Sequence, residues 1–357
     1  MARKAAASRA REVQSRRGGI LCAAIVVALL GCACSSRKRE RSDEAPAAAQ
    51  VSARPAINES PRVERALDGP DAANAMRPES ADPAWVRPFL WRVDVSPPSY
   101  LFGTIHVPDA RLAKLPRDAE WAYAESTVVA TEVALDGGGK GDYLAHATLP
   151  RGTRFEGVVP PTLLDRTRAA FAAAHQPFAP MSPYKPWFVA VRVSMLDHMR
   201  ELSTGTALDK LLYRRAAVDG KALDPLETTN EQGAIFDALD DAEQVTYLER
   251  TLDSADKSKR EHRDPILALL AAYLAGDETE IDHELYRDYD AKNAVDVKVM
   301  KRLVDDRNVV LADRLVPRLA SGKSYFVAVG TAHLVGPRSV VALLRKRGVH
   351  VERVADR

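Results

Sequence analysis

The segments Tyr100-Leu-Phe-Gly-Thr-Ile-His106 and Tyr325-Phe-Val-Ala-Val-Gly-Thr-Ala-His333 share one pattern, although 227 residues separate their histidines. In each, a short apolar and aromatic run ends in Gly-Thr-x-His. Such runs, closed by a turn signal, predict buried β-strands over residues 100–105 and 325–329. A glycine at the end of a strand lets the backbone turn sharply or approach a ligand closely, so Gly103 and Gly330 are predicted backbone-turn residues.

Two further strands and a helical middle complete the predicted fold. Residues 127–135 and 349–354 have the apolar, β-branched pattern of strands. Apolar residues three and four apart predict helices between and around them. We therefore expect an α/β or α+β fold, in which N-terminal and C-terminal strands pair in a central mixed sheet and the middle of the chain is largely helical. The predicted helices cover residues 162–175, 185–200, 206–218, 231–252, 265–274, 295–303, 307–319 and 337–347.

The N-terminus has the features of an export signal. An apolar run of eleven residues, 20–30, follows a basic segment; it is too short to span a bilayer but has the length of a signal-peptide core. It ends in Leu-Leu-Gly-Cys32, which resembles the bacterial lipobox, where the cysteine is acylated and becomes the mature N-terminus. We expect a lipoprotein signal peptide over residues 1–31 and anchoring to a lipid bilayer through acylated Cys32. An ordinary secretory signal or an uncleaved anchor helix is the alternative.

The composition changes near residue 83. Residues 32–82 are rich in Ala, Pro, Ser, Arg and Glu, which predicts a disordered tether because such a segment buries little apolar surface. The first tryptophan is Trp85, and we place the folded domain over residues 83–357. Because Ala33 rather than aspartate follows Cys32, the likeness to lipoproteins implies the periplasmic face of the outer membrane of a Gram-negative bacterium.

Charge and cysteine content exclude several classes of function. Residues 1–42 carry a net charge of +8, which leaves −6 on the rest of a chain whose total is +2. The acidic body gives no electrostatic reason to bind nucleic acid, so no nucleic-acid partner is expected. All three cysteines lie within the first 34 residues, so the domain can form neither a disulfide nor a thiolate metal site.

Three side chains form a candidate metal site. His106 and His333 would lie beyond the carboxyl ends of their strands, where open α/β sheets bind ligands. Glu132 lies within the apolar run 127–135, where a carboxylate must be paired, protonated or ligating. Two histidines and one carboxylate suit Mn, Fe, Co or Zn and leave coordination positions open. The alternative is that each histidine is a hydrogen-bonded cap at the end of its strand.

The order of these and other motifs resembles the TraB/GumN family, whose animal relatives include the membrane-tethered Tiki metalloproteases. The resemblance covers residues 83–357. It implies a divalent metal, Mn or Co before Zn or Fe, held by His106, Glu132 and His333, and a fold like that of erythromycin-esterase-like and ChaN-like proteins. The other motifs that carry it are Lys185-Pro-Trp187, Gly205-Thr-Ala-Leu-Asp209, Gly220-Lys221, Leu226-Glu-Thr228, Glu231-Gln232 and Arg307-Asn308.

Two further residues are candidate catalytic groups. Glu227 could act as a general base that takes a proton from water, or as an N-terminal charge of the helix that follows it. Arg307 opens the predicted helix 307–319, where a cation opposes the helix dipole. Its position favours a partner such as Glu132, Glu227 or a substrate carboxylate, and the alternative is a solvated surface charge. Asp209 could support a metal ligand or act as a first-turn acid of its helix.

Three functions remain open at this stage. The first is metal-dependent hydrolysis, with a peptide or protein as the substrate by resemblance to the tethered proteases. The second is a non-catalytic, lipid-anchored regulator that binds a peptide signal. The third is haem or metal binding without catalysis, since one relative with a similar fold binds haem and fold does not determine the cofactor.

Overall fold

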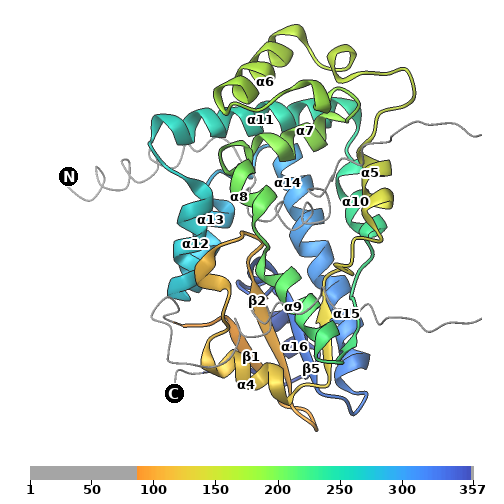
Figure 1. The fold of residues 1–357 in the computed structure, drawn as a ribbon, viewed down its shortest axis with the longest axis vertical. Coiled ribbons are helices and arrows are strands. Elements are labelled where there is room, and N and C mark those ends of the chain that lie inside the picture. Colours follow the sequence, from red (N-terminus) through yellow and green to blue (C-terminus); the bar gives the residue numbers. More distant parts are fainter. Residues whose placement is uncertain (1–86, 355–357) are drawn as a thin grey trace, which may run out of the picture.

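A six-stranded mixed sheet forms the lower part of the molecule in Figure 1, and helices surround it. The computed structural model describes residues 87–354; the predicted signal peptide, the tether with Cys32 and the predicted domain boundary lie outside the described residues. The strand order is β4-β3-β5-β2-β1-β6. The strands are β1 (Leu90–Val93), β2 (Ser99–Thr104), β3 (Val128–Thr131), β4 (Ala222–Leu223), β5 (Tyr325–Gly330) and β6 (Val351–Arg353).

The four strands β4, β3, β5 and β2 are parallel, and their carboxyl ends therefore meet at one edge of the sheet. In the register, Thr104 of β2 lies opposite Gly330 of β5, and Thr131 of β3 lies opposite Ala328. Every residue of β2, β3 and β5 is buried, as expected for parallel strands covered on both faces. The pairing of N-terminal with C-terminal strands predicted from sequence is confirmed.

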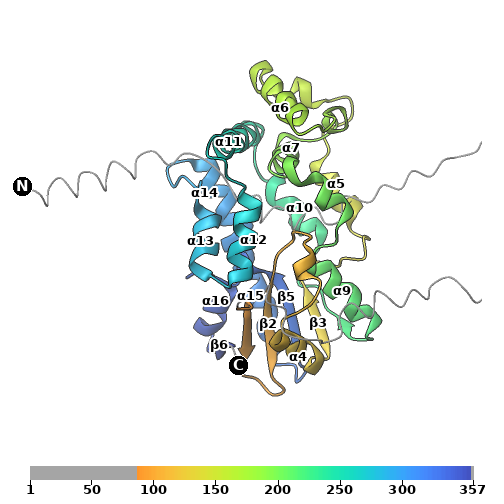
Figure 2. The same ribbon diagram turned by 60° about the vertical axis from the view of Figure 1, so that its left-hand side comes forward.

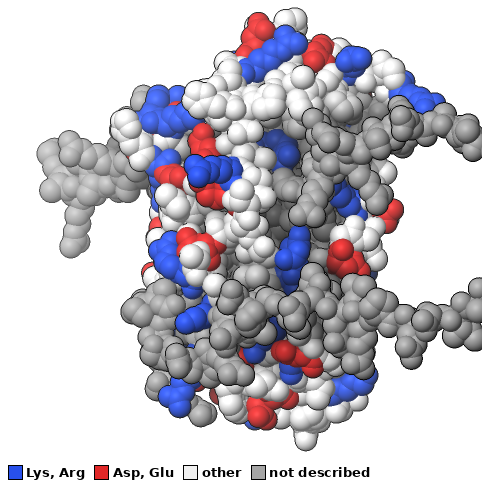
Figure 3. All heavy atoms as spheres, in the orientation of Figure 1, with Lys and Arg blue, Asp and Glu red and all other residues white. Residues whose placement is uncertain are grey.

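Helices cover both faces of the sheet (Figures 1 and 2). One face packs against α4 (Arg117–Glu125) and α9 (Leu208–Val218). The other face is covered by α15 (Arg307–Leu319) and α16 (Val340–Lys346). The charged side chains of both signs are interspersed over the described part of the face drawn in Figure 3.

A second group of helices lies above the carboxyl edge of the sheet (Figure 1). Its core includes Trp187, fully buried and stacked on Phe236 with ring centroids 5.1 Å apart. Among residues 87–354, no helix has both the length and the apolar character that a membrane crossing requires. The helices of this group are α5 (Lys140–Ala147), α6 (Pro161–Ala173), α7 (Pro186–Val193), α8 (Met199–Thr204), α10 (Thr229–Asp237), α11 (Asp241–Arg260), α12 (Pro265–Ala275), α13 (Glu278–Tyr286) and α14 (Ala294–Met300).

The structure corrects several predicted boundaries. The predicted strand 127–135 ends at Thr131, so Glu132 lies just beyond the strand. The predicted helix 231–252 is two helices, because Asp240 forms a capping box with Glu243 and starts α11. The predicted helix 185–200 is also interrupted, between α7 and α8. The sequence pattern missed β1, β4, α4, α5 and α13, which are short elements of two to nine residues.

Candidate metal and hydrolytic site

The carboxyl edge of the sheet brings the three predicted metal ligands together. His106 follows β2 by two residues, Glu132 follows β3 directly, and His333 ends the 3-10 turn that follows β5. All three are at most 9% exposed. The Nε2 atoms of His106 and His333 lie 3.8 and 3.9 Å from the same carboxylate oxygen, Oε1 of Glu132. The two Gly-Thr-x-His segments therefore converge in space, as the sequence predicted.

The two glycines of these segments are required by close packing. A Cβ atom on Gly330 would lie 3.1 Å from Oε1 of Glu132 and 3.2 Å from Nε2 of His106, within the space that the ligand atoms face. The N–H of Gly330 also donates a 2.7 Å hydrogen bond to Oε1 of Glu132. A Cβ atom on Gly103 would lie 2.6 Å from Oγ1 of Thr331, so this glycine lets the two segments pack against each other. Both predicted turn residues thus serve close approach rather than a left-handed backbone.

A polar side chain from a different helix lies against the second nitrogen of each histidine ring. Nδ1 of His106 lies 3.1 Å from Oδ2 of Asp209 on α9, and Nδ1 of His333 lies 2.7 Å from Oδ1 of Asn308 on α15. The amide Nδ2 of Asn308 donates to the carbonyl of Arg338, which leaves its Oδ1 to accept from His333. The proton of a neutral His333 therefore lies on Nδ1, and Nε2 presents a lone pair toward Glu132.

The two histidines differ in their electrostatic environment. Burial lowers the pKa of His106, but the nearby carboxylates of Asp209 and Glu132 outweigh this and raise it to about 10. Burial and the positive charge of Arg307 lower the pKa of His333 to about 3. His333 is thus neutral at neutral pH, the protonation state in which imidazole binds metals, whereas His106 is protonated in the metal-free site and would have to release a proton to bind an ion.

Arg307 links the two buried glutamates. Its Nη2 donates to Oε2 of Glu132 and to Oε2 of Glu227, both at 2.6 Å, and its Nε lies 3.1 Å from Oε1 of Glu227. All three side chains are at most 6% exposed. Burial alone would raise the pKa of Glu132, but the attraction of Arg307 dominates and holds it well below its usual value. Glu132 is therefore ionised in this site.

Arg307 pairs with the predicted partners Glu132 and Glu227, but the predicted reason, a position at the start of a helix, is wrong. Arg307 does not open a helix, because residues before it are helical: α14 continues through a π-helical turn, Lys301–Asp306, into α15. Its need for carboxylates comes from burial, since an unpaired guanidinium at 4% exposure would be very costly. The π-turn directly before Arg307 is of a type found often at functional sites.

Glu227 reaches the site from the edge of the sheet. Its N–H donates to the carbonyl of Glu132, so the chain after β4 runs beside the end of β3. Gln232 on α10 lies between the two glutamates, with Nε2 3.4 Å from Glu132 and 3.3 Å from Glu227. Thr228, not Glu227, caps α10 and forms a capping box with Glu231. Thr228 therefore holds the cap position, and the interpretation of Glu227 as a general base stays a prediction.

The ligand atoms face a small apolar pocket of about 30 Å³, which has room for about two water molecules and opens toward solvent. The two Gly-Thr-x-His segments and Glu132 form its polar floor, and α12 and α13 supply its apolar walls, including Leu269 and Tyr273. Neither Glu227 nor Arg307 lines this pocket. A substrate in the pocket would therefore meet His106, Glu132 and His333 directly, while Arg307 and Glu227 lie behind Glu132.

The site fits a divalent metal ion on three observations. Its donors are two imidazole nitrogens and a carboxylate, the donor types that Mn, Fe, Co and Zn accept. The nitrogens lie 3.8 and 3.9 Å from one oxygen of Glu132, against about 3.3 Å for atoms that share one tetrahedral ion. The three ligand atoms do not all lie within 4.8 Å of one another, so the two rings would have to move closer together to share an ion. The ring of His333 is oriented by a hydrogen bond at its second nitrogen, and the second nitrogen of His106 lies 3.1 Å from a carboxylate oxygen, an arrangement common for metal-bound histidines. Three buried polar atoms of these residues and their neighbours have no hydrogen-bond partner, as expected where an ion or water completes a site: Oγ1 of Thr104, Nδ1 of His106 and Oδ1 of Asp209.

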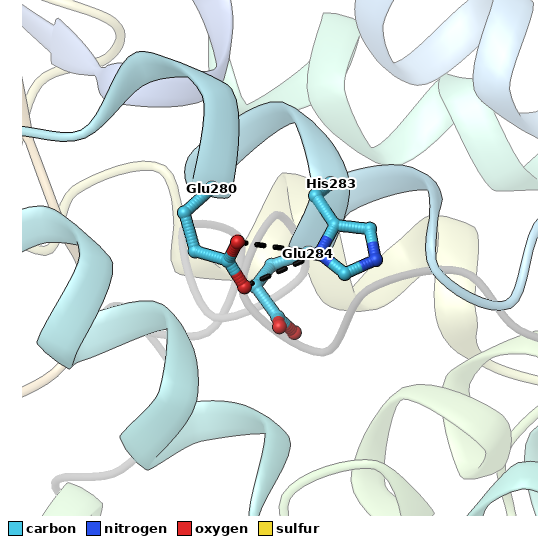
Figure 4. A group of neighbouring side chains, drawn as sticks. All are labelled: Glu280, His283 and Glu284. Carbon is cyan, nitrogen blue, oxygen red and sulfur yellow. Dashed lines mark hydrogen bonds and ion pairs between the residues drawn. The ribbon is translucent and has the colours of Figure 1, made fainter.

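A second group of metal-ligand residues lies on α13. The ligand atoms of Glu280, His283 and Glu284 all lie within 4.8 Å of one another, a tighter set than His106, Glu132 and His333 (Figure 4). However, Glu284 already pairs with Arg263 and Arg287, and the side chains of Glu280 and His283 are 45% and 49% exposed. The group is an ion-pair network at the surface, so we do not assign a metal to it.

Fold and site together define a class of protein: an α/β domain with a buried His-Glu-His set at the carboxyl edge of parallel strands. The chain belongs to the TraB/PrgY/gumN family, whose model matches residues 89–353. No solved structure matches the chain, so the expected likeness to erythromycin-esterase-like and ChaN-like folds stays a prediction.

Characterised relatives carry the name metalloprotease. The chain is 26% identical over 309 residues to the metalloprotease TIKI1 of Danio rerio, which covers 74% of this chain and 62% of the relative. It is 23% identical over 314 residues to a metalloprotease TIKI homologue of Amphimedon queenslandica, covering 75% and 61%. It is 24% identical over 330 residues to TIKI1 of Homo sapiens, covering 79% and 65%. The match thus spans about three-fifths of the length of these relatives.

Proposed function

We propose that this chain is a membrane-tethered, metal-dependent hydrolase that cleaves peptide bonds, with a divalent ion held by His106, Glu132 and His333. The observation that carries the proposal is the convergence of these three buried side chains on one space at the floor of a pocket. The names of the relatives support a protease-like activity and a divalent cofactor. Because the match covers only part of those relatives, the activity is proposed for this domain on its own residues.

When bound, such an ion would polarise a peptide carbonyl and lower the pKa of water. The protein contributes fixed geometry: Asp209 and Asn308 hold the two rings, and the N–H of Gly330 and the guanidinium of Arg307 hold the two oxygens of Glu132. The apolar walls supplied by α12 and α13 would exclude bulk water and strengthen these interactions.

Arg307 and Glu227 act on the reaction through Glu132 in this proposal. Both oxygens of Glu227 accept hydrogen bonds from Arg307, and Glu227 does not line the pocket. A general-base role for Glu227 would require it to leave Arg307, and it stays a prediction. A Glu227→Gln variant separates the roles: a positioning residue keeps the pH profile of kcat while kcat falls, whereas loss of a base removes the acidic limb of that profile.

The location of the protein is also a proposal. The lipobox-like segment supports acylation of Cys32 and attachment to the periplasmic face of the outer membrane of a Gram-negative bacterium. Metabolic labelling with a radioactive fatty acid tests this directly. Label should enter the wild-type protein and be lost in Cys32→Ser, and label retained in that variant would refute lipid anchoring at this residue.

Elemental analysis of the purified protein tests the metal site. We expect near-stoichiometric divalent metal in the wild type, retained in His283→Ala and lost in both His106→Ala and His333→Ala. His283 is the matched control, because it belongs to the tighter ligand group on α13. Metal lost in the His283 variant and kept in the other two would show that the ion binds the group on α13, and would refute the proposed site. Absence of metal after dialysis against Mn, Co, Fe and Zn would refute the hydrolase and favour the peptide-binding regulator.

A further inference from the structure

A second pocket of about 310 Å³ lies beside the metal-site pocket, and Leu285 and Ala332 line both. Ala332 is the variable residue of the second Gly-Thr-x-His segment, so it forms part of the wall between the two spaces. The volume is within the range of about 300–1,000 Å³ that ligand pockets occupy. We call it the tyrosine pocket; its other lining residues include Tyr286, Tyr289, Asp282, Asp305, Asn308 and Arg338.

We infer that the tyrosine pocket is a subsite that binds a positively charged group of the peptide substrate, either a lysine or arginine side chain or a free amino terminus. The inference rests on the proposed function, because it names the kind of substrate that the neighbouring site would cleave. Three features of the pocket support it: its charge, its aromatic rings and its link to His333.

The charge of the pocket is negative. Asp282 and Asp305 face one cation, Arg338. Asp305 is under-satisfied: Oδ1 is buried without a hydrogen-bond partner, and Oδ2 has Arg338 at 3.1 Å. The side chain of Arg338 is 63% exposed, and solvent screening makes such surface pairs weak. An ammonium or guanidinium of a ligand can therefore displace Arg338 from Asp305 at little cost.

The aromatic rings of the pocket suit the same chemistry. Tyr286 and Tyr289 pack edge to face, with centroids 5.6 Å apart and planes at 88°, so they present two differently directed surfaces. Cations are attracted to aromatic faces, and more strongly where water is excluded. Two tyrosine rings beside two carboxylates favour a cationic ligand over an anionic or purely apolar one.

The pocket is joined to the metal site through Asn308. This residue lines the tyrosine pocket, and its Oδ1 accepts from Nδ1 of His333 at 2.7 Å. Its Nδ2 donates to the carbonyl of Arg338, in the loop that carries the cation to be displaced. A peptide that places its cationic group here would cross Ala332 and present the adjoining backbone to the metal-site pocket.

Binding of synthetic peptides to the metal-free protein tests the inference without requiring catalysis. The probes are four alanine-based nonapeptides. Three have an acetylated amino terminus and carry lysine, glutamine or glutamate at the central position. The fourth is the glutamine peptide with a free amino terminus. Isothermal titration should give at least tenfold tighter binding of the lysine or free-amine peptide than of the acetylated glutamine peptide. Equal affinities, or tightest binding of the glutamate peptide, would overturn the inference.

Two variants with opposite expected effects locate the binding. Asp305→Asn should abolish the preference for the cationic peptide, while Arg338→Ala should strengthen it, because a competing cation is removed. Asp313→Asn is the matched control, since Asp313 pairs with Arg347 at the surface outside the pocket. Weaker cationic binding in Arg338→Ala, or an unchanged preference in Asp305→Asn, would refute the assignment.

Failure of the inference and failure of the proposed function give different results. Cationic binding with this pattern of variants, but no cleavage by the metal-loaded protein, would leave the subsite and refute the hydrolase. If the rate of cleavage does not depend on charge at any substrate position, the hydrolase function would stand and the cationic subsite would be refuted.

Discussion

Arg307→Met is expected to destabilise the metal-free protein by about 3–5 kcal/mol, because it leaves buried carboxylates without their shared cation. Arg307 has a 5% exposed side chain and hydrogen bonds at 2.6 Å to both Glu132 and Glu227. Methionine fills a similar volume, so lost packing accounts for little of the effect. The double variant Arg307→Met/Glu227→Gln should be less destabilised than the sum of the two single variants, by about 1–3 kcal/mol, since it removes one of the two unpaired charges.

Urea unfolding at pH 8 and pH 5 provides the assay. In the wild type the pKa of Glu132 is held low, so its ionised form stabilises the fold above the unfolded pKa of 4.5, and that stabilisation is lost as the pH falls further. Without Arg307, burial raises this pKa, so the loss of stability should be largest at pH 8 and smaller at pH 5. A loss below about 1 kcal/mol at pH 8, or strictly additive effects of the two substitutions, would refute the view that Arg307 compensates buried charge.

Three other results are expected. Gly330→Ala should abolish metal binding and lower the free energy of unfolding by about 1–3 kcal/mol, because its Cβ would crowd Glu132. The control is Gly157→Ala, whose Cβ would have no atom within 4 Å. It should leave both the metal content in elemental analysis and the stability in urea unfolding unchanged. Asn308→Leu should weaken metal binding about 10–100-fold in a chelator competition, with Asn308→Asp restoring most of it, and equal binding in all three proteins would contradict the role of Asn308. In the metal-free protein the pKa of His333 is lowered to about 3. The neutral ring therefore stabilises the folded state fully above pH 6.5, and this stabilisation is lost as the pH falls toward 3. His333→Gln should accordingly flatten the decline in the free energy of unfolding between pH 7 and pH 5.

The parallel core of the fold could be predicted because it depends on local pattern. Strands β2, β3 and β5 are continuous apolar runs, and the repeated Gly-Thr-x-His marked where two of them end. The short elements β1 and β4 could not be predicted, because four and two residues give no periodicity to detect. Strand β4 and the residues after it are held by N–H groups of Ala222, Asp224, Leu226 and Glu227, which donate to the carbonyls of Thr127, Val129, Thr131 and Glu132. This pairing is long-range information.

The candidate site, like the fold, could be predicted from the sequence only in part. His106 and His333 were found because each follows an apolar strand, and Glu132 because it is a charged residue within an apolar run; the parallel direction of the strands brings their ends together. The residues that contact the two histidine rings, Asp209 and Asn308, have no comparable sequence pattern. Asp209 could equally be a first-turn acid, and Asn308 was noted only as part of a motif. Their role depends on how α9 and α15 dock against the sheet, which no local pattern records.

The supporting residues also explain why the site requires the complete domain. The strands supply three ligand side chains, but Asp209 on α9 and Asn308 on α15 approach the two rings from opposite faces of the sheet. Arg307, one residue before Asn308, fixes Glu132 from the same helix. A single displacement of α15 would therefore disturb both Glu132 and His333, while leaving His106 and Asp209 in place. Variants that loosen α15 far from the pocket should reduce metal affinity before they unfold the sheet, and this order of loss would distinguish a site assembled by helix docking from one fixed by the strands alone.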